Sequence, residues 1–209
     1  PLNAIVGYTD LLFHDKEATE EDLDCRKEIN DATQYMLNII NDIISISKVE
    51  SGQMEVSLSK TNINKVTEYI HTFFYPEATK KGIELILHNS LKDKEAFINT
   101  DKEKIYAILT NLVKNALKFT SKGKIEIGYE RKDNSYQFYV KDTRVRIPKE
   151  QQKSIFERFR QGSEARTRDY EVAGLGLSIS KGFVELLGGK LWVESELNKG
   201  TTFYFTLPK

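Results

Sequence analysis

The chain has 209 residues, of which 31 are basic and 31 are acidic, so its formal net charge is zero, and 39 % of its residues are hydrophobic. This balance gives no support for a nucleic-acid function or for attraction to an anionic membrane surface. A single cysteine, Cys25, excludes an internal disulfide and a cysteine-based zinc site, as expected of a protein in the reducing cytosol.

The sequence contains no run of 18 apolar residues and no signal-peptide pattern at its start. We therefore expect a soluble, cytoplasmic chain without membrane contact of its own, although a longer parent protein could be anchored in the cell membrane. The length allows one large domain or two small ones. The pattern favours two, at residues 1–52 and 53–209.

Residues 1 to about 48 predict a helical hairpin. A short helix at the start has an apolar side, and the polar stretch 15–22 predicts the connection to a longer helix. Apolar residues of the longer helix follow a heptad spacing, and three more widen the stripe: Ile29, Ala32, Met36, Ile39, Ile43 and Ile46, then Leu37, Ile40 and Ile44. One hairpin cannot cover so wide a stripe, which predicts a homodimer with a four-helix bundle.

The long helix is expected to end near Ser51 and Gly52, because glycine favours a helix C-terminus. An alternating segment around Met54, Val56 and Leu58 follows. Beyond it, periodicity predicts helices at 62–81, 101–119 and 175–187, and strands at 83–88, 124–130, 137–141, 190–194 and 202–206. Helices and antiparallel strands of this kind form an α+β, two-layer sandwich.

The helix at 101–119 carries polar residues that suit a metal and a phosphate. Asn111, Asn115 and Lys118 are spaced by four and three residues, so they share one helix face. An amide oxygen is a hard ligand suited to Mg²⁺, and a lysine can reach phosphate oxygens as a point charge. The alternative is that these residues are solvated polar positions.

Five segments follow one another along the chain: PLNAIVGYTDLL (1–12), NLVKNALKFT (111–120), IFERFRQ (155–161), GLGLSIS (174–180) and KGTTFYFTLP (199–208). In this order they resemble the core of a sensor histidine kinase of two-component signalling. The first resembles the run that follows the phosphoacceptor histidine, and the others resemble the N box, the F box, the second glycine box and the closing strand. The resemblance covers nearly the whole chain. It implies a sandwich of the histidine kinase, gyrase and chaperone ATPase type.

The resemblance also implies a nucleotide site that holds ATP and Mg²⁺. By this analogy Asn115 coordinates the magnesium ion, Lys118 contacts phosphate and Asn111 supports the same face. Asp142 corresponds to the aspartate that accepts a hydrogen bond from the adenine amine, a task that suits a group that only accepts. Gly174, Leu175 and Gly176 correspond to the turn that opens a helix towards the phosphates.

The same comparison places Phe156 and Phe159 against a mobile lid at about 160–173. Core packing is the alternative for both side chains. Asp142 could likewise be a turn aspartate.

Three positions depart from the family pattern in the nucleotide loops. Arg144 and Arg146 stand where the first glycine box has glycines, and Val172 stands where the second often has one. At a positive φ each change costs on the order of 1 to 3 kcal/mol. We therefore expect impaired ATP binding in this copy, whether the changes are natural or engineered. Lys104 replaces a usual arginine, which keeps the charge but loses bidentate pairing.

The phosphoacceptor histidine and its neighbouring acid belong upstream of Pro1, so no catalytic residue is assigned in the chain itself. His14 lacks the following motif, and we interpret it as a solvated residue at a helix end. His71 and His88 are expected to be structural.

Three functional hypotheses follow. In the first, the parent protein is a protein-histidine kinase that phosphorylates itself from ATP and passes the phosphoryl group to an aspartate of a response-regulator receiver domain. Leu2, Val6 and the lower part of the second helix could form the regulator's docking surface, with bundle core as the alternative. In the second, the chain is a pseudokinase or an engineered kinase-dead docking module. The third, a chaperone or gyrase type of ATPase, is disfavoured by the heptad hairpin.

Overall fold

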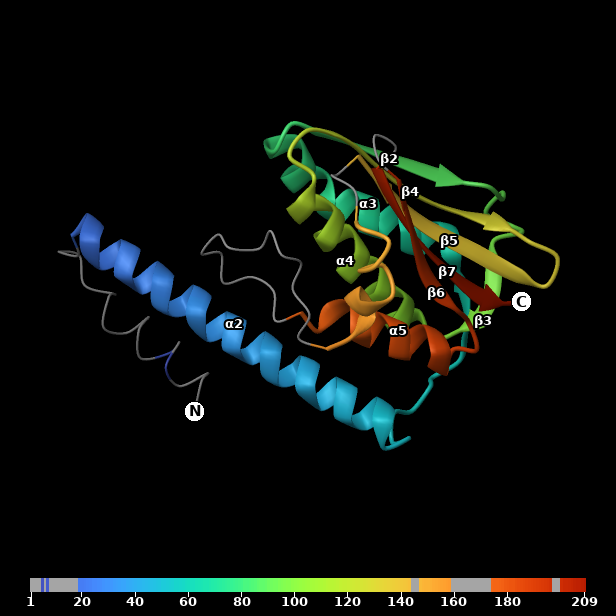
Figure 1. The fold of residues 1–209 in the computed structure, drawn as a ribbon, viewed down its shortest axis with the longest axis horizontal. Helices are drawn as coiled ribbons and strands as arrows, with labels where there is room; N and C mark the ends of the chain where they lie inside the picture. The colour runs from blue at the N-terminus through green and yellow to red at the C-terminus, as the bar shows by residue number, and fades with distance from the viewer. Residues whose placement is uncertain (1–4, 6, 8–18, 144–146, 159–173, 197–199) are drawn as a thin grey trace.

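A computed structural model of the chain describes residues 5, 7, 19–143, 147–158, 174–196 and 200–209. One long helix leads to a two-layer unit in which helices cover one face of a sheet (Figure 1). The helices are α2 (Glu20–Glu50), α3 (Ile63–Lys80), α4 (Lys102–Phe119) and α5 (Gly176–Leu186), with a 3-10 helix η1 (Ser154–Phe156). The strands are β1 (Ser59–Asn62), β2 (Ile83–Asn89), β3 (Phe97–Thr100), β4 (Gly123–Arg131), β5 (Ser135–Asp142), β6 (Leu191–Glu196) and β7 (Gly200–Pro208). The predicted α+β class is therefore confirmed.

Local signals fix both ends of α2. Thr19 accepts a hydrogen bond from the backbone N–H of Asp22, and the Asp22 carboxylate accepts from the Thr19 backbone, which together form a capping box. The helix thus begins inside the stretch 15–22, all of which had been expected to be a connection. At the other end Ser51 is the C-cap and Gly52 has a φ of 68°, which confirms the predicted stop.

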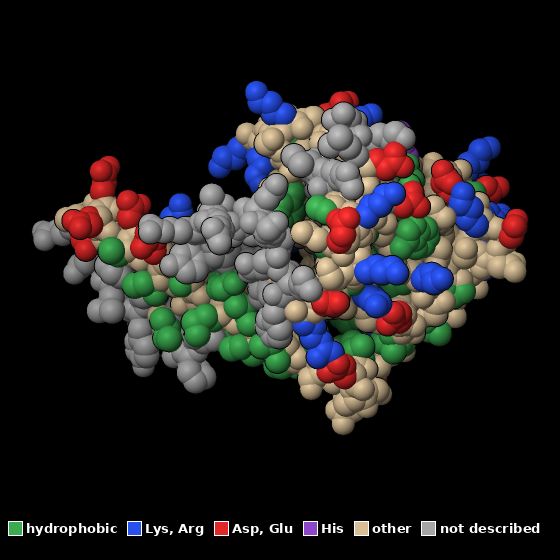
Figure 2. All heavy atoms as spheres, viewed as in Figure 1, with side chains coloured by type: hydrophobic (Ala, Val, Ile, Leu, Met, Phe, Trp, Pro, Cys, Tyr) green, Lys and Arg blue, Asp and Glu red, His purple; other side chains and the backbone are tan. Residues whose placement is uncertain are grey.

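Much of the predicted apolar stripe of α2 faces solvent in the single chain, whereas Ile46 packs against the core. Met36 is 51 % exposed, and Ile40, Ile43 and Ile44 are each between 44 % and 47 % exposed. Figure 2 shows hydrophobic side chains gathered along this helix. An exposed stripe of this kind favours burial against another helix. The first helix of the predicted hairpin falls almost entirely outside the described residues, so the four-helix bundle stays a prediction.

The main sheet has the strand order β2-β4-β5-β7-β6. The expectation of an all-antiparallel sheet was wrong in one place, because β2 and β4 pair in parallel, from Ile83 opposite Gly123 to Asn89 opposite Tyr129. The chain passes through β3 and α4 between these two strands, and such a crossover returns it in the same direction. A separate antiparallel pair, β1 with β3, was not predicted at all.

The core lies between the three shorter helices and the sheet. Ile108 and Leu112 of α4, with Ile127 of β4, are completely buried. Phe138 and Phe205 on neighbouring strands stack with their ring centroids 4.7 Å apart. Burial of apolar area of this kind is the main stabilising contribution and holds α4 in a fixed place over the sheet.

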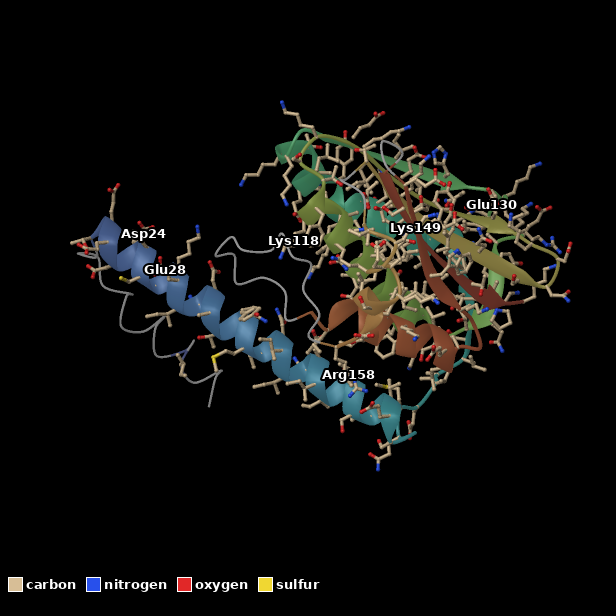
Figure 3. All side chains as sticks on the ribbon, in the orientation of Figure 1. Asp24, Glu28, Lys118, Glu130, Lys149 and Arg158 are labelled. Carbon is tan, nitrogen blue, oxygen red and sulfur yellow. The ribbon has the colours of Figure 1, made fainter. Side chains whose placement is uncertain are left out.

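The end of α2 packs against α5. A β-carbon built at Gly182 would lie 3.0 Å from Val49 Cγ1, so the absence of a side chain at residue 182 lets the two helices approach closely. Glu50 forms an ion pair with Arg158, and Figure 3 shows Arg158 beside the last turns of α2. No helix in the described part of the chain is both long enough and apolar enough to cross a bilayer.

Candidate functional site

Asn111, Asn115 and Lys118 all lie on α4 and are partly buried. Asp101 is the N-cap of this helix, as predicted, and accepts a hydrogen bond from the Lys104 backbone N–H at 3.1 Å. Buried residues lie between the polar ones along the helix. Asn111, Asn115 and Lys118 are therefore placed at the boundary between the core and the solvent. Lys118 Nζ lies 5.6 Å from the centroid of the Phe119 ring. The helix therefore presents two amides and one ammonium group along one edge, as the spacing predicts.

Asp142 is the last residue of β5 and is completely buried. It sits opposite Ile125 on β4 and Thr201 on β7. Gly200, with a φ of 88°, begins β7 beside it, and a β-carbon there would come within 2.0 Å of the Asp142 carbonyl oxygen. Any side chain at residue 200 would therefore displace the end of the strand that carries this carboxylate.

Thr143 connects the end of β5 to the loop that follows α4. Its Oγ1 accepts a hydrogen bond from the Lys124 backbone N–H at 3.2 Å and donates one to the Lys122 carbonyl at 3.2 Å. Since Thr143 follows Asp142 directly and Lys122 lies just past the C-terminus of α4, the carboxylate lies at the same end of the sandwich as Asn115 and Lys118. These polar groups, which are 24 to 27 residues apart in the sequence, therefore lie towards one end of the sandwich.

The predicted glycine turn opens α5. Gly174 has a φ of 70°, a left-handed conformation that favours glycine. Leu175 is the N-cap residue, provides no side-chain cap and is completely buried, so only its backbone could face a ligand. Gly176 differs from Gly174, because a β-carbon there would make ordinary contacts of 3.5 to 3.7 Å with Asn111 and its φ is not positive.

Packing among the described residues therefore does not explain why residue 176 is glycine. A phosphate that approaches the first turn of α5 would explain it, because helix N-termini bind anions through their backbone N–H groups. The turn and the donors on α4 thus fit a nucleotide phosphate chain.

Asn111 faces α5 directly. Its Nδ2 donates to the Gly176 carbonyl at 3.3 Å and to Ser180 Oγ at 3.3 Å, while Ser180 Oγ donates to the same carbonyl at 2.9 Å. Ser180 is completely buried. The family resemblance implies a supporting role for Asn111, but the sequence pattern does not predict Ser180 as its partner. One signal for Ser180 was available in the sequence. The largely apolar helix GLSISKGFVEL has a serine four residues after its first glycine, where a hydroxyl can bond to the backbone of the preceding turn.

Lys104, at the start of α4, stands where the family usually has arginine. Its ammonium group nevertheless has two partners. Its Nζ lies 2.6 Å from Asp101 Oδ2 and 2.6 Å from the Glu55 carbonyl. Burial raises the pKa of Asp101, but hydrogen bonds from Lys104 Nζ and from the backbone N–H groups of Ser57 and Lys104 outweigh it and hold the pKa below its usual value. This pair joins the chain after α2 to the helix that carries the site.

The segment that follows the first glycine box is held against β6. The Ile147 backbone N–H donates to Ser195 Oγ at 2.9 Å, and Gln152 Nε2 donates to the Ile147 and Ser195 carbonyls at 3.0 and 3.1 Å. Phe156 packs edge-to-face on Phe203 with centroids 6.3 Å apart, which favours the core interpretation of this residue.

Several predicted features lie outside the described residues. These are the departures Arg144, Arg146 and Val172, the lid at 160–173, and Phe159, Leu2, Val6 and His14. His71 is described, and its ring Nε2 lies 3.1 Å from the Leu85 carbonyl, which accords with its expected structural role.

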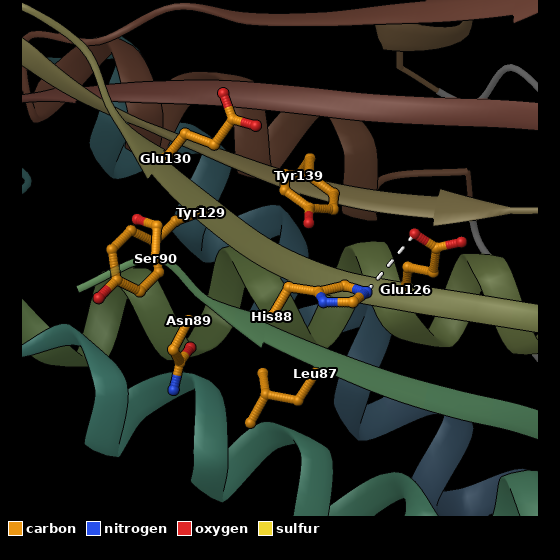
Figure 4. Close-up of a pocket in the computed structure, with 8 residues that line it drawn as sticks. All are labelled: Leu87, His88, Asn89, Ser90, Glu126, Tyr129, Glu130 and Tyr139. Carbon is orange, nitrogen blue, oxygen red and sulfur yellow. Dashed lines mark ion pairs between the residues drawn. The ribbon is translucent and has the colours of Figure 1, made fainter. Parts of the chain in front are cut away.

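A shallow hollow on the sheet face turned away from the helices is a separate feature (Figure 4). His88 Nε2 and Glu126 Oε2 lie 3.8 Å apart there, and Glu126 also pairs with Lys124 at 2.7 Å. Tyr139 covers Gly128, where a β-carbon would come within 2.6 Å of the phenol oxygen. In the part of the chain that the structure describes, no three His, Cys, Asp or Glu side chains are grouped to hold a metal ion.

Two families match the sequence in succession. Residues 1–52 match the His Kinase A (phospho-acceptor) domain, and residues 100–209 match the histidine kinase-, DNA gyrase B- and HSP90-like ATPases. Similar curated proteins include the autoinducer 2 sensor kinase/phosphatase LuxQ of Vibrio vulnificus, 33 % identical over 217 residues, covering all of this chain. The signal transduction histidine-protein kinase BarA of Escherichia coli is 32 % identical over 210 residues and covers 98 % of the chain. The chain spans about a quarter of these relatives, 25 % of LuxQ and 23 % of BarA.

Solved structures agree with this assignment. Full-length ShkA in complex with AMPPNP aligns with a TM-score of 0.86 at 28 % identity, covering all of this chain and 43 % of that one. The histidine kinase ThkA in complex with the response regulator protein TrrA aligns with a TM-score of 0.68 at 24 % identity, covering all of this chain and 57 % of that one. At that identity the second likeness concerns the fold alone.

Proposed function

Because the chain belongs to the sensor histidine kinase family, we propose that it is the dimerisation and ATP-binding core of such a kinase, with domains at 1–52 and 53–209. The observation that carries this proposal is that Thr143, next to Asp142, is hydrogen-bonded to the loop just past the C-terminus of α4, the helix that carries Asn115 and Lys118. The similarity to ShkA, which was solved with AMPPNP, supports a nucleotide at this place.

In this proposal each residue has a separate task. Asp142 accepts a hydrogen bond from the adenine amine, and its burial excludes water that would compete for that bond. Lys118 provides positive charge for phosphate oxygens, and the first turn of α5 offers backbone N–H donors. Asn115 would hold Mg²⁺, which when bound neutralises charge that develops on the transferred phosphoryl group.

The phosphoryl group would go to a histidine upstream of Pro1 in the full protein and then to an aspartate of a response regulator. The exposed stripe of α2 supports the homodimer that this transfer uses, because two such stripes can cover each other in a four-helix bundle. ThkA, which shares the fold, was solved with a response regulator, and we propose a partner of that class here.

A second candidate is a pseudokinase that keeps the dimer and the regulator docking without ATP turnover. It is favoured by Arg144, Arg146 and Val172 at positions where the family pattern has glycine. A long side chain over the adenine pocket would obstruct the base and strain the loop.

Calorimetric titration with Mg-ATP separates the two candidates. The chain as written and a triple variant, Arg144→Gly, Arg146→Gly and Val172→Gly, are compared with the same triple variant carrying Asp142→Ala. For a kinase core, the triple variant should bind ATP and Asp142→Ala should abolish binding. Tight binding by the unmodified chain would end the pseudokinase reading. No binding by either chain would contradict the proposed site.

A further inference from the structure

Asn111 occupies a place on α4 that distinguishes it from Asn115, although one helical turn separates them. Its side chain lies between α4 and α5, where Gly176 and Ser180 accept its hydrogen bonds. The Gly176 carbonyl can only accept, so the atom that faces it must be the amide nitrogen. The orientation of this amide is therefore fixed by chemistry.

The amide nitrogen has two hydrogens, and both are engaged with α5. A further bond from Nδ2 to a phosphate would break one of them. Ser180 Oγ, completely buried, donates to the Gly176 carbonyl at 2.9 Å and accepts from Asn111, so three polar groups form a closed triangle across the helix contact. The same two helices carry buried apolar residues, among them Ile179 of α5 and Leu112 of α4. An apolar contact alone does not fix the rotation of one helix on another as hydrogen bonds do.

The triangle holds the part of α5 that matters most for a nucleotide. Gly176 is the first residue of the helix, and its carbonyl belongs to the turn whose N–H groups lack a side-chain cap. Asn115 and Lys118 extend from the same face of α4 that Asn111 occupies. A small rotation of α5 would move its N–H groups away from phosphates bound by Lys118 and by a magnesium ion at Asn115.

We propose that Asn111 is a positioning residue, which locks the first turn of α5 to α4 through Gly176 and Ser180 and does not itself bind the metal or the phosphate. This inference rests on the proposed nucleotide site. It predicts that residue 111 acts on nucleotide affinity through the placement of α5.

The substitution Asn111→Asp tests the inference, because the two possible roles give opposite results. A carboxylate cannot donate to the Gly176 carbonyl and would repel it, so positioning predicts a loss of ATP affinity of tenfold or more at every Mg²⁺ concentration. If Asn111 were a metal ligand, Asp would retain or strengthen Mg²⁺ binding. Asn115→Asp serves as the matched comparison and should alter the Mg²⁺ dependence. Asn99→Asp on the exposed face of β3 controls for added charge.

Ser180→Ala removes one corner of the triangle and leaves the bond from Asn111 to the Gly176 carbonyl. It should weaken ATP binding less than Asn111→Asp does, and it remains informative if Asn111→Asp fails to fold. All variants are titrated in the background with Arg144→Gly, Arg146→Gly and Val172→Gly. ATP affinity that is unchanged in Ser180→Ala and improved in Asn111→Asp would overturn the proposal.

Hydrogen exchange of the nucleotide-free protein provides a readout that does not need ATP. Asn111→Asp and Ser180→Ala should speed exchange of the hydrogen-bonded amides at residues 179–183 several-fold, while α3 amides should exchange at the same rate as in the protein without these substitutions. Unchanged exchange in α5 overturns the positioning role even if ATP binds. If exchange in α5 is faster in the two variants but the protein without these substitutions does not bind ATP, the positioning role is supported and only the proposed function is contradicted.

Discussion

Val49 on α2 lies over Gly182 on α5, and a β-carbon at residue 182 would come within 3.0 Å of Val49 Cγ1. The long helix and the sandwich therefore touch at a point where an added methyl group would require Val49 to shift. The ion pair between Glu50 and Arg158 lies next to this contact. The glycine thus sets how closely the two parts of the chain approach.

Gly182→Ala should loosen α2 from α5 without unfolding the sandwich. Alanine in a helix interior is favoured over glycine by about 1 kcal/mol, so α5 itself should gain stability. Hydrogen exchange should show faster exchange at residues 46–50 and slower exchange within α5. Lys181→Ala on the exposed side of α5 is the control and should leave α2 unaffected. Equal protection of α2 in both variants would show that Val49 yields to the added methyl group.

Lys104→Met should destabilise the protein by about 3 kcal/mol, because it leaves the buried carboxylate of Asp101 without its ammonium partner. Chemical denaturation measures this difference. Lys132→Met is the control, since its ion pair with Glu130 is half exposed and should contribute little. A loss as small as that of the control would mean that the backbone N–H groups of Ser57 and residue 104 are sufficient partners for the Asp101 carboxylate.

The ion pair of Lys104 with Asp101 also predicts that the protein loses stability at acidic pH. The folded pKa of Asp101 lies below its usual value, so its contribution is fully present above that usual value and is lost as the pH falls through the folded pKa. The free energy of unfolding of the unsubstituted chain should therefore decline below about pH 4, where free aspartates become protonated. In Lys104→Met this part of the decline should be smaller.

Much of the fold could be predicted because its signals are local. The helix with Asp101 as N-cap and Phe119 at its end was placed correctly, since the cap and the apolar periodicity lie within one segment. Strand β1, with the sequence SKTN, has no such signal, because its conformation depends on pairing with β3 about 40 residues later. The parallel pairing of β2 and β4 was missed for a related reason, as it depends on the path through α4.

In the candidate site too, the residues within local motifs could be predicted, whereas contacts between distant segments could not. The motifs identified Asn115, Lys118 and Asp142, whose roles stay predictions. The hydrogen bonds of Asn111 to α5 could not be predicted, because they require the packing of two helices 65 residues apart. Thr143 was missed since a single threonine after a strand gives no sign of the loop that it will bind.

Asp42→Asn should strengthen the contact of α2 with the sandwich at neutral pH. Burial raises the pKa of Asp42, and the nearby Lys114 on α4 lowers it less than burial raises it. The contribution of Asp42 to the free energy of unfolding is therefore fully present below the usual aspartate pKa. It is lost as the pH rises through the higher pKa of Asp42 in the folded protein. Asparagine removes this decline. Thermal unfolding of both proteins from pH 3 to pH 7 should show curves that diverge as the pH rises, and parallel curves would contradict the expectation.

Gly174 and Gly176 should respond differently to alanine, although both belong to the same predicted motif. Gly174 has a φ of 70°, where alanine costs about 1 kcal/mol of folding stability. At Gly176 the three atoms nearest to the added methyl group all belong to Asn111, at ordinary distances of 3.5 to 3.7 Å, so Gly176→Ala should leave the unfolding midpoint unchanged or raise it. Its effect should instead fall on ATP affinity, measured in the background with glycine at residues 144, 146 and 172. Loss of affinity without loss of stability would identify the surface above residue 176 as ligand space, whereas unchanged affinity would place the phosphates elsewhere.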